Sequence, residues 1–316
     1  MRYRQLGRSG LTVSVVGLGC NNFGTRCDLR ATRVVVEAGL EAGVTLLDTA
    51  DVYGNRGGSE TLLGQALRGR RDEVVLATKF GASMGGPPWE ARGSRRYVRR
   101  AVEASLRRLD TDHLDLYQQH VPDPKTPLEE TLAVLDELVA EGKVRYIGSS
   151  NFAAWQIVEA DWIARTGHLT RFVSAQNQYN LLERDLEYEV VPACDRYGVG
   201  ILPYFPLANG LLTGKYRRGE PAPAGTRLAR RSDLLTEEAF DRIDALEKYG
   251  VERGRTLLEV AIGGLAAQPA VGSVIAGATR HDQVLANAAA AEWEPTPEDV
   301  AELAKLAPRR PTGKHR

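Results

Sequence analysis

Short apolar segments alternate with longer segments of helical period along most of the chain. Eight short runs occur, and most of them are continuously apolar rather than alternating between apolar and polar residues. Strands that are buried on both faces of a parallel sheet show this pattern. The runs cover residues 14–19, 45–48, 74–79, 114–120, 146–150, 173–176, 200–204 and 273–277.

The segments between these runs have the periodicity of amphipathic helices. The clearest of them covers residues 127–141, where apolar residues recur on one stripe. Thr126 and Glu129 predict a capping box at its start, and the proline that follows Thr126 suits the first helical position. Gly142 predicts the end of this helix, and Ser94 predicts the N-cap of the preceding one.

Eight strand–helix units in one chain predict an α/β fold, the (β/α)8 TIM barrel. Residues 2–12 have glycines at turn positions and predict a small N-terminal β-hairpin that closes the barrel floor. An open, doubly wound sheet of similar period is the alternative. It is disfavoured because residues 17–22, after the first run, lack the third glycine of the dinucleotide-binding motif.

The pattern predicts a single domain over residues 1–316, with a flexible basic tail at residues 308–316. Two connections, residues 81–93 and 215–232, are long enough to act as lids or binding loops. Both follow predicted strands, so both are expected at the C-terminal mouth of the barrel, where such folds carry their sites.

Charge and composition exclude several classes of protein. The 316 residues include 41 Lys plus Arg and 41 Asp plus Glu, so the zero net charge argues against nucleic acid or an anionic membrane as a partner. No apolar run reaches the length of a membrane span, and no signal-peptide pattern is expected at the N-terminus. The three cysteines form no Cys-x-x-Cys motif, which favours a reducing cytoplasm, and the histidines show no metal-ligand spacing, which predicts no metal site.

Four polar residues of different chemistry fall at or just after predicted strand ends. Asp48, Lys79 and His120 close three of the runs, and Tyr53 follows Asp48 by five positions. If these strands are neighbours in a barrel, the four side chains converge. An ammonium beside a phenol lowers the pKa of the phenol, and an imidazole can hydrogen-bond an oxygen that gains negative charge. The set therefore suits proton delivery to a carbonyl oxygen while a nicotinamide supplies hydride, which no side chain can do.

Each of the four residues alone also has a structural interpretation. An Asp–Lys pair at strand ends can be a satisfied ion pair in the barrel rim, His120 can be a packing residue, and Tyr53 can be a surface aromatic. The functional interpretation depends on all four lying on one face, because groups with perturbed pKa values cluster at functional sites.

Five motifs extend this pattern: LDTADVYG (47–54), ATK (77–79), LYQQH (116–120), GSSNF (148–152) and GLLTGKY (210–216). On these motifs the sequence resembles the aldo-keto reductase family from residue 3 to about residue 287. The resemblance implies a (β/α)8 barrel in which Tyr53 is the general acid, Lys79 lowers its pKa and Asp48 supports Lys79. It also implies that His120 orients a small-molecule carbonyl substrate and that the cofactor is NADPH.

The resemblance further implies a set of cofactor contacts. Ser150, Asn151 and Gln176 are expected at the nicotinamide carboxamide, and Tyr204 is expected to stack on the ring. Arg280 is able to pair bidentately with a 2′-phosphate, which favours NADPH over NADH. The other cofactor residues expected are Gly19, Cys20, Asn21, Asp48, Phe205, Pro206, Leu207, Ala208, Gly210, Lys215, Arg227, Gly277, Thr279, Gln283 and Asn287.

The identity of the substrate does not follow from the sequence. Phe23, Trp89 and Phe205 are expected to line its pocket together with Tyr53 and His120. Loops at the mouth of a barrel set specificity, so aldehydes, ketones, sugars and quinones all stay open.

Three departures from the family pattern weaken parts of the cofactor interpretation. Phe205 replaces a common serine, which leaves one hydrogen bond to the pyrophosphate in doubt. Ala276 replaces a common proline, and Ala286 replaces an acidic residue that contacts adenine. Weaker binding of the adenosine half, or looser discrimination between NADP and NAD, is the expected consequence.

Two other functions stay open at this point. One is a non-catalytic NADP(H)-binding regulator resembling the potassium-channel β-subunits, although that branch of the family tends to lack the histidine found at position 120. The other is a metal-dependent or phosphate-sugar barrel enzyme from another superfamily. The oligomeric state and the physiological direction of the reaction do not follow from the sequence.

Overall fold

A computed structural model describes residues 1–223, 225–230 and 232–309 of the chain. Eight parallel strands form one sheet in the order β10-β3-β4-β5-β6-β7-β8-β9. Their bounds are β3 (Val16–Gly19), β4 (Leu46–Asp48), β5 (Val75–Phe80), β6 (Leu114–Gln119), β7 (Val144–Ser150), β8 (Phe172–Gln176), β9 (Gly200–Ile201) and β10 (Val274–Gly277).

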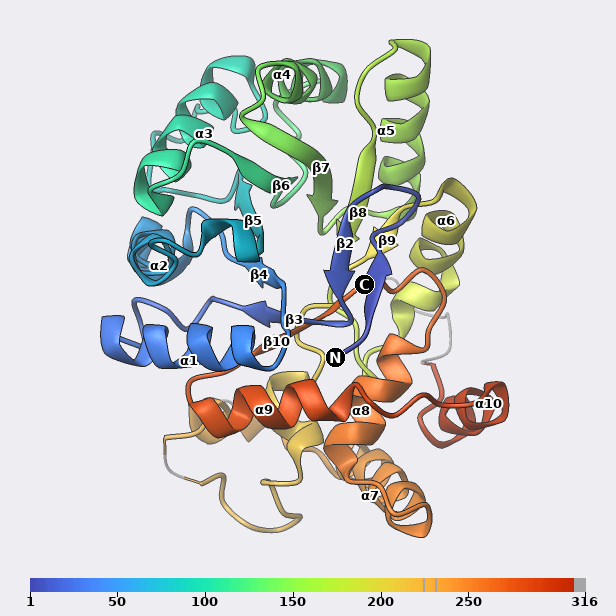
Figure 1. Ribbon diagram of the computed structural model, residues 1–316. Helices are drawn as coiled ribbons and strands as arrows, with labels where there is room; N and C mark the ends of the chain where they lie inside the picture. Colours follow the sequence, from blue (N-terminus) through green and yellow to red (C-terminus); the bar gives the residue numbers. More distant parts are fainter. Residues whose placement is uncertain (224, 231, 310–316) are drawn as a thin grey trace.

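Backbone hydrogen bonds join the last strand of this order to the first. The N–H of Ile201 donates to the carbonyl of Ala270 over 2.7 Å, and the N–H of Ile275 donates to the carbonyl of Pro203 over 3.0 Å. The sheet therefore curls into the (β/α)8 barrel that the eight apolar runs predict (Figure 1), and the open-sheet alternative is excluded. Nearly every strand residue is buried, as expected when helices cover a parallel sheet.

Helices surround the barrel in Figure 1. They are α1 (Leu29–Glu41), α2 (Tyr53–Ala66), α3 (Arg95–Leu109), α4 (Leu128–Ala140), α5 (Ala154–Thr166), α6 (Val190–Tyr197), α7 (Glu237–Glu252), α8 (Leu257–Ala266), α9 (His281–Ala290) and α10 (Pro297–Leu306). Short 3-10 segments lie at Arg71–Glu73, Asp185–Tyr188, Ala208–Thr213, Arg227–Arg230 and Ser232–Leu234.

The predicted helix ends are confirmed in two cases and wrong in one. Ser94 caps α3 by accepting a hydrogen bond from the N–H of Tyr97, and Gly142 follows α4 with a φ of +75°. The N-cap of α4 is Pro127, without a side-chain hydrogen bond. The hydroxyl of Thr126 donates instead to Oδ2 of Asp123 over 2.7 Å. The predicted capping box is therefore absent, because a carboxylate three residues earlier competes for the threonine.

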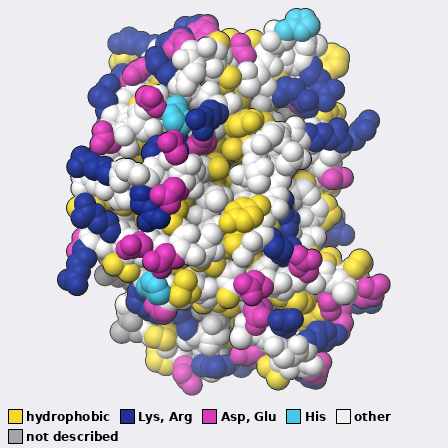
Figure 2. Space-filling model, in the orientation of Figure 1, with side chains coloured by type: hydrophobic (Ala, Val, Ile, Leu, Met, Phe, Trp, Pro, Cys, Tyr) yellow, Lys and Arg dark blue, Asp and Glu magenta, His cyan; other side chains and the backbone are white. Residues whose placement is uncertain are grey.

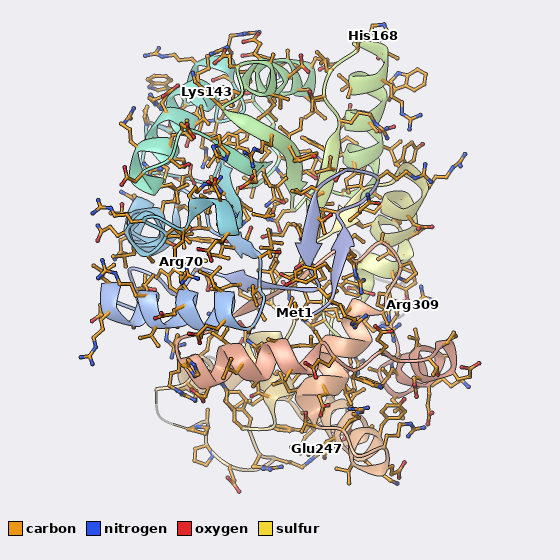
Figure 3. The ribbon with its side chains drawn as sticks, in the orientation of Figure 1. Met1, Arg70, Lys143, His168, Glu247 and Arg309 are labelled. Carbon is orange, nitrogen blue, oxygen red and sulfur yellow. The ribbon has the colours of Figure 1, made fainter. Side chains whose placement is uncertain are left out.

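The N-terminal hairpin predicted for residues 2–12 pairs β1 (Tyr3–Gln5) with β2 (Thr12–Ser14). It lies across the barrel in Figure 1, and Met1 lies on the same face in Figure 3. Leu6, Leu11 and Val13 pack with strand residues in one buried cluster. Gly7 has a φ of +58°, and a Cβ there would lie 2.5 Å from the carbonyl oxygen of Gly198, so only glycine fits this contact. The hairpin closes the barrel floor as expected.

The surface carries both charge signs. Figure 2 shows basic and acidic side chains interspersed over one face, in keeping with the zero net charge. Among the described residues, no helix is both long enough and apolar enough to cross a membrane. Most of the predicted flexible tail, residues 310–316, lies outside the part of the chain that the structure describes.

Candidate active site

The four polar residues expected to converge do so at the carboxyl ends of neighbouring strands. Asp48 is the last residue of β4 and pairs in register with Ala77 of β5. Lys79 lies near the end of β5, and His120 directly follows β6, where its N–H donates to the carbonyl of Phe80. Asp48 and Lys79 are 3% and 0% exposed, so this ion pair is almost completely removed from water.

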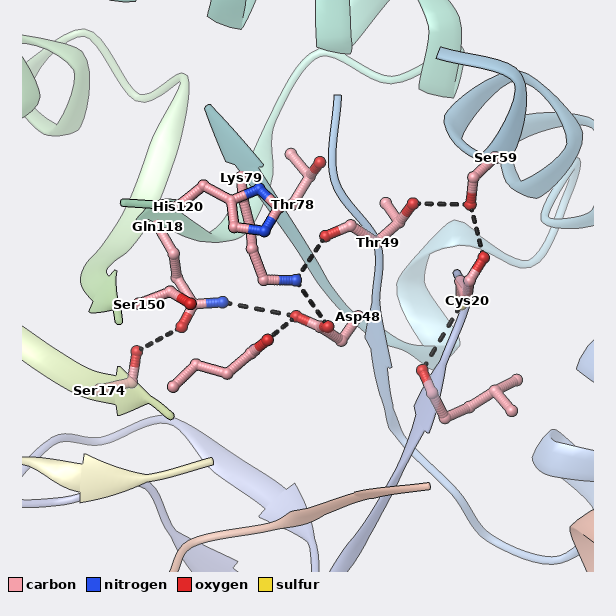
Figure 4. A network of polar contacts seen from close by, with 12 residues as sticks. Cys20, Asp48, Thr49, Ser59, Thr78, Lys79, Gln118, His120, Ser150 and Ser174 are labelled. Atoms are coloured by element: carbon pink, nitrogen blue, oxygen red, sulfur yellow. Dashed lines mark hydrogen bonds and ion pairs between the residues drawn. The ribbon is translucent and has the colours of Figure 1, made fainter. Parts of the chain in front are cut away.

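The carboxylate of Asp48 connects its own strand, β4, to side chains of β5, β6 and β8 (Figure 4). Its Oδ2 accepts a hydrogen bond from Nζ of Lys79 over 2.7 Å, and Nζ also donates to the carbonyl of Thr49 over 2.9 Å. Its Oδ1 accepts from Nε2 of Gln176 over 2.9 Å and from Nε2 of Gln118 over 3.4 Å. A buried charge needs such partners, and together they fix the orientation of Lys79.

Tyr53 is held by an unusual start of α2. Residues 54–57 all have positive φ, and a Cβ on Gly54 would lie 2.3 Å from the N atom of Ser59. The hydroxyl of Ser59 donates to the carbonyl of Cys20 and contacts the hydroxyl of Thr49, each over 2.8 Å. These contacts join the tight turn to the ends of β3 and β4, so Tyr53 has a defined position beside them.

The Tyr53 ring lies close to both Lys79 and His120. Nζ of Lys79 is 5.1 Å from the ring centroid, and the Tyr53 and His120 rings meet edge to face with centroids 5.7 Å apart. Burial raises the pKa of Tyr53, whereas the charge of Lys79 lowers it, and the net direction is upward. Lys79 thus lowers the pKa of Tyr53 as expected, but the desolvation of the hydroxyl, which the sequence does not reveal, outweighs this effect.

The pKa values of Lys79 and His120 shift in opposite directions. Burial alone would lower the pKa of Lys79, but the carboxylate of Asp48 and the nearby Tyr53 outweigh it, and the pKa is raised. Burial, together with the charge of Lys79, lowers the pKa of His120 to about 3. His120 is therefore neutral near pH 7, and its Nδ1 is buried without a hydrogen-bond partner in the described part of the chain.

A cavity of about 760 Å³ opens beside these residues. Asp48, Tyr53 and His120 line it, while Lys79 is buried behind them. Of the expected cofactor residues only Ala208 does not line the cavity. Those that do are Gly19, Cys20, Asn21, Asp48, Ser150, Asn151, Gln176, Tyr204, Phe205, Pro206, Leu207, Gly210, Lys215, Arg227, Gly277, Thr279, Arg280, Gln283 and Asn287.

Two of the residues expected in the substrate pocket lie elsewhere. Phe23 is 0% exposed and packs in the main hydrophobic core, away from the cavity lining. Trp89 is 74% exposed and also does not line the cavity. Its segment, residues 81–93, is held instead by the 121–126 loop, where Oδ2 of Asp123 accepts from the N–H of Gly93 over 2.7 Å. Phe205 does line the cavity.

The described part of the second long connection, residues 215–223, 225–230 and 232, lines the cavity through Lys215, Gly225, Thr226 and Arg227. Arg227 places its guanidinium 5.5 Å from the centroid of the Phe205 ring and donates to Oδ1 of Asn22 over 3.4 Å. Arg26, on the connection after β3, donates to the carbonyl of Gly225 over 2.9 Å. Of the two connections predicted to carry sites, this one contributes to the cavity, and it brings cationic groups to it.

The cavity wall formed by residues 205–210, next to this connection, has a backbone shaped for close approach. Phe205, Ala208 and Asn209 have positive φ, which non-glycine residues rarely adopt, and Gly210 has a φ of +98°. A Cβ on Gly210 would lie 2.8 Å from Nζ of Lys215. Such turns direct N–H groups into a concave surface that suits phosphate oxygens. With the amide and hydroxyl groups at the inner end, the residues present fit an extended dinucleotide.

Several cavity residues were missed by the sequence analysis. They are Asn22, Arg26, Asn209, Thr213, Gly225, Thr226, Leu258, Ile275, Ala278 and Asp282. Arg26 and Asn22 follow the first barrel strand, so the rule that such loops face the mouth was a usable signal for them. No sequence signal pointed to Asp282, because its position in the cavity is notable only through its contact with the side chain of Arg280. Among the described residues, no group of three or more His, Cys, Asp or Glu could hold a metal ion.

Comparisons with known proteins agree with this geometry. The model of the aldo/keto reductase family matches residues 15–308. The uncharacterized oxidoreductase YrpG of Bacillus subtilis (strain 168) is 39% identical over 297 residues, covering 90% of this chain and 89% of that protein. Probable voltage-gated potassium channel β-subunits of Oryza sativa subsp. japonica and Arabidopsis thaliana are 36% and 35% identical, each over 98% of this chain and 98% and 99% of their own lengths.

Proposed function

This chain belongs to the aldo/keto reductase family, and we propose that it is an NADPH-dependent oxidoreductase that reduces an aldehyde or ketone to an alcohol. The observation that carries the proposal is the cluster of Asp48, Tyr53, Lys79 and His120 beside a cavity of about 760 Å³ that nearly all of the expected cofactor residues line. The bound nicotinamide supplies hydride, and the side chains supply the proton and the orientation.

Tyr53 is the proton donor in this proposal. Its raised pKa keeps the hydroxyl protonated at physiological pH, so a proton is available when the carbonyl oxygen gains negative charge. Proton transfer leaves a phenolate next to the ammonium of Lys79, which stabilises the negative charge. The same lysine thus assists the reaction after the proton leaves, even though the resting phenol is not unusually acidic.

Asp48 and His120 have supporting roles. Asp48 holds Lys79 charged and in place through the 2.7 Å contact, and Gln118 and Gln176 in turn hold Asp48. Neutral His120 is suited to donate a hydrogen bond to the substrate oxygen without competing for the proton. Each of the four residues therefore has one task in the reduction of a carbonyl group.

The remaining lining residues suit the cofactor. Nδ2 of Asn151 donates to the carbonyl of His120 and to Oγ of Ser150, so Oδ1 of Asn151 and the hydroxyl of Ser150 are the groups left for the cofactor. The hydroxyl of Tyr204 donates to the same Oδ1 over 2.9 Å, which orients that ring. Nε2 of Gln176 is used by Asp48, so its Oε1 is the atom left for a carboxamide N–H. Lys215 and Arg227 supply positive charge for a pyrophosphate.

The direct test of this function uses the purified chain. NADPH is first titrated against the protein by fluorescence, and turnover is then followed by loss of reduced nicotinamide with a panel of aromatic and aliphatic aldehydes, ketones and quinones at saturating NADPH. We expect saturable binding and turnover with at least one class of carbonyl. Absence of NADPH binding would contradict the proposal.

A second candidate function rests on the relatives named as potassium channel β-subunits. In that case the chain binds NADP(H) and acts through a protein partner rather than through turnover. Tight NADPH binding with no turnover of any carbonyl in the panel favours this candidate. The three free cysteines are all buried, and we place either function in the reducing cytoplasm.

A further inference from the structure

Arg280, the residue expected to hold a 2′-phosphate, already has an anionic partner. Its Nε donates to Oδ1 of Asp282 over 2.9 Å, and its Nη2 donates to Oδ2 over 2.8 Å. The ion pair raises the pKa of Arg280 and lowers that of Asp282. Both residues line the cavity, at the start of α9. One side of the guanidinium, Nε and Nη2, therefore pairs with a carboxylate of the same chain, in an ion pair whose side chains are 64% and 66% exposed.

The rest of this wall does not replace the occupied guanidinium. Arg280 is the only Arg or Lys between residues 277 and 287. Oε1 of Gln283 accepts hydrogen bonds from the N–H and the hydroxyl of Thr279, over 2.9 Å and 3.2 Å. Position 286 is an alanine. The wall is thus satisfied by its own hydrogen bonds, and its net side-chain charge from Arg280 and Asp282 is zero.

This arrangement has different consequences for the two dinucleotides. A 2′-phosphate carries close to two negative charges. It either displaces Asp282 from Nε and Nη2 of Arg280 or binds on the Nη1 side, and in both cases it lies near the carboxylate of Asp282. A ribose with a free 2′-hydroxyl meets no such repulsion, and a carboxylate is the group that accepts hydrogen bonds from a ribose hydroxyl in many NAD sites. The positive end of α9 favours an anion at this place, but Asp282 already supplies one.

We propose that Asp282 is a specificity-determining residue that reduces the preference for a 2′-phosphorylated cofactor, so that the site accepts NADH alongside NADPH. The inference rests on the proposed function, because it requires the adenosine half of a dinucleotide to lie against α9. It assigns to Asp282 the discrimination that sequence assigns to Arg280 alone. Arg280 still attracts the phosphate, and Asp282 limits the gain in affinity that this attraction gives to a 2′-phosphorylated cofactor.

The test measures binding rather than turnover. Titration calorimetry of the full chain compares 2′,5′-ADP with 5′-AMP, two adenosine fragments that differ only in the 2′-phosphate, and then NADPH with NADH. The variants are Asp282→Asn and, as a matched control, Glu298→Gln. Glu298 is also an acidic residue in the first turn of a helix, α10, but it does not line the cavity. Thermal unfolding confirms that both variants are folded.

The proposal predicts that Asp282→Asn raises the ratio of 2′,5′-ADP to 5′-AMP affinity by about tenfold, because the negative charge beside the phosphate is removed and the Nε and Nη2 donors of Arg280 become available to it. NADPH should gain over NADH by a similar factor, and Glu298→Gln should leave both ratios within about twofold of wild type, as expected for a distant exposed charge.

Two results would overturn the inference. If both fragments bind but the ratio is unchanged or falls in Asp282→Asn, another cation, such as Arg227, holds the 2′-phosphate and Asp282 has no role in specificity, while the proposed function stands. If neither the fragments nor the dinucleotides bind the wild-type chain, the proposed function fails and this inference fails with it.

Discussion

Replacing Lys79 by methionine removes the cation from the buried pair with Asp48. The two charged atoms are 2.7 Å apart and the residues are almost fully buried, so at an effective dielectric constant of about 20 their attraction is about 6 kcal/mol. Desolvation offsets part of this attraction. The loss in unfolding free energy on removing one partner is therefore expected to be about 3–5 kcal/mol, because the Asp48 carboxylate is left uncompensated.

Urea unfolding followed by circular dichroism measures this loss. The double variant Lys79→Met/Asp48→Asn is expected to recover at least about 2 kcal/mol of it, since the unpaired charge is gone. Lys143→Met is the matched control, because Lys143 forms exposed ion pairs with Glu103 and Glu141 and should cost no more than about 1 kcal/mol.

The pH dependence of this stabilisation follows from the raised pKa of Lys79. The stabilisation is fully present below the unfolded value of 10.5 and is lost only as the pH rises through the folded value. A Lys79→Met variant within about 1 kcal/mol of wild type at pH 7 would refute the reasoning. A double variant no more stable than the single one would refute it as well.

Three further predictions concern residues around the site. Burial, with repulsion from Glu60, raises the pKa of Asp51 from 3.8 to about 7. Between these pH values the folded state holds a proton that the unfolded state releases. The unfolding free energy of the wild type should therefore fall by up to about 4 kcal/mol between pH 4 and pH 7. Asp51→Asn should flatten this decline in urea unfolding measured across that range, and an unchanged slope would show that another group titrates. Because the pKa of His120 is about 3, the acidic limb of the kcat/KM profile should show no group titrating near 6.5, and a limb at that pH that disappears in His120→Asn would contradict the assignment. Gly210→Ala should weaken NADPH binding by about tenfold or more, because the new Cβ meets Nζ of Lys215 and the backbone has a φ of +98°. The control variant Gly219→Ala, at a solvent-facing position, should bind NADPH as wild type does.

The barrel could be predicted from sequence because each strand is buried on both faces. Strands buried on both faces have continuously apolar sequences, and all eight apolar runs coincide with strands. The convergence of Asp48, Tyr53, Lys79 and His120 then follows from topology, since neighbouring parallel strands end at the same rim. The capping of α4 did not follow, because the choice of Thr126 between a helix N–H and Asp123 is made by local geometry.

Other features of the site depend on distances and burial that no sequence pattern records. The direction of the Tyr53 pKa results from competition between desolvation and Lys79, and its outcome requires the depth of the hydroxyl. Phe23 and Trp89 lie in segments that follow predicted strands, so the sequence indicates that both are near the mouth of the barrel. In the structure Phe23 is buried in the core, whereas Trp89 is exposed to solvent. The sequence indicates Arg280 as a phosphate ligand, but it does not show that the guanidinium also pairs with Asp282.

The proton-donor role of Tyr53 is tested most directly by single-turnover kinetics of the NADPH-bound chain with an aldehyde that it reduces. The variant is Tyr53→Phe, and the control is Tyr3→Phe, which removes a hydroxyl that donates to the carbonyl of Gly43 beside the floor hairpin. We predict that Tyr53→Phe binds NADPH within about twofold of wild type but transfers hydride at least about 100-fold more slowly, while Tyr3→Phe matches wild type in both binding and hydride transfer. A Tyr53→Phe variant that transfers hydride at the wild-type rate would contradict the account.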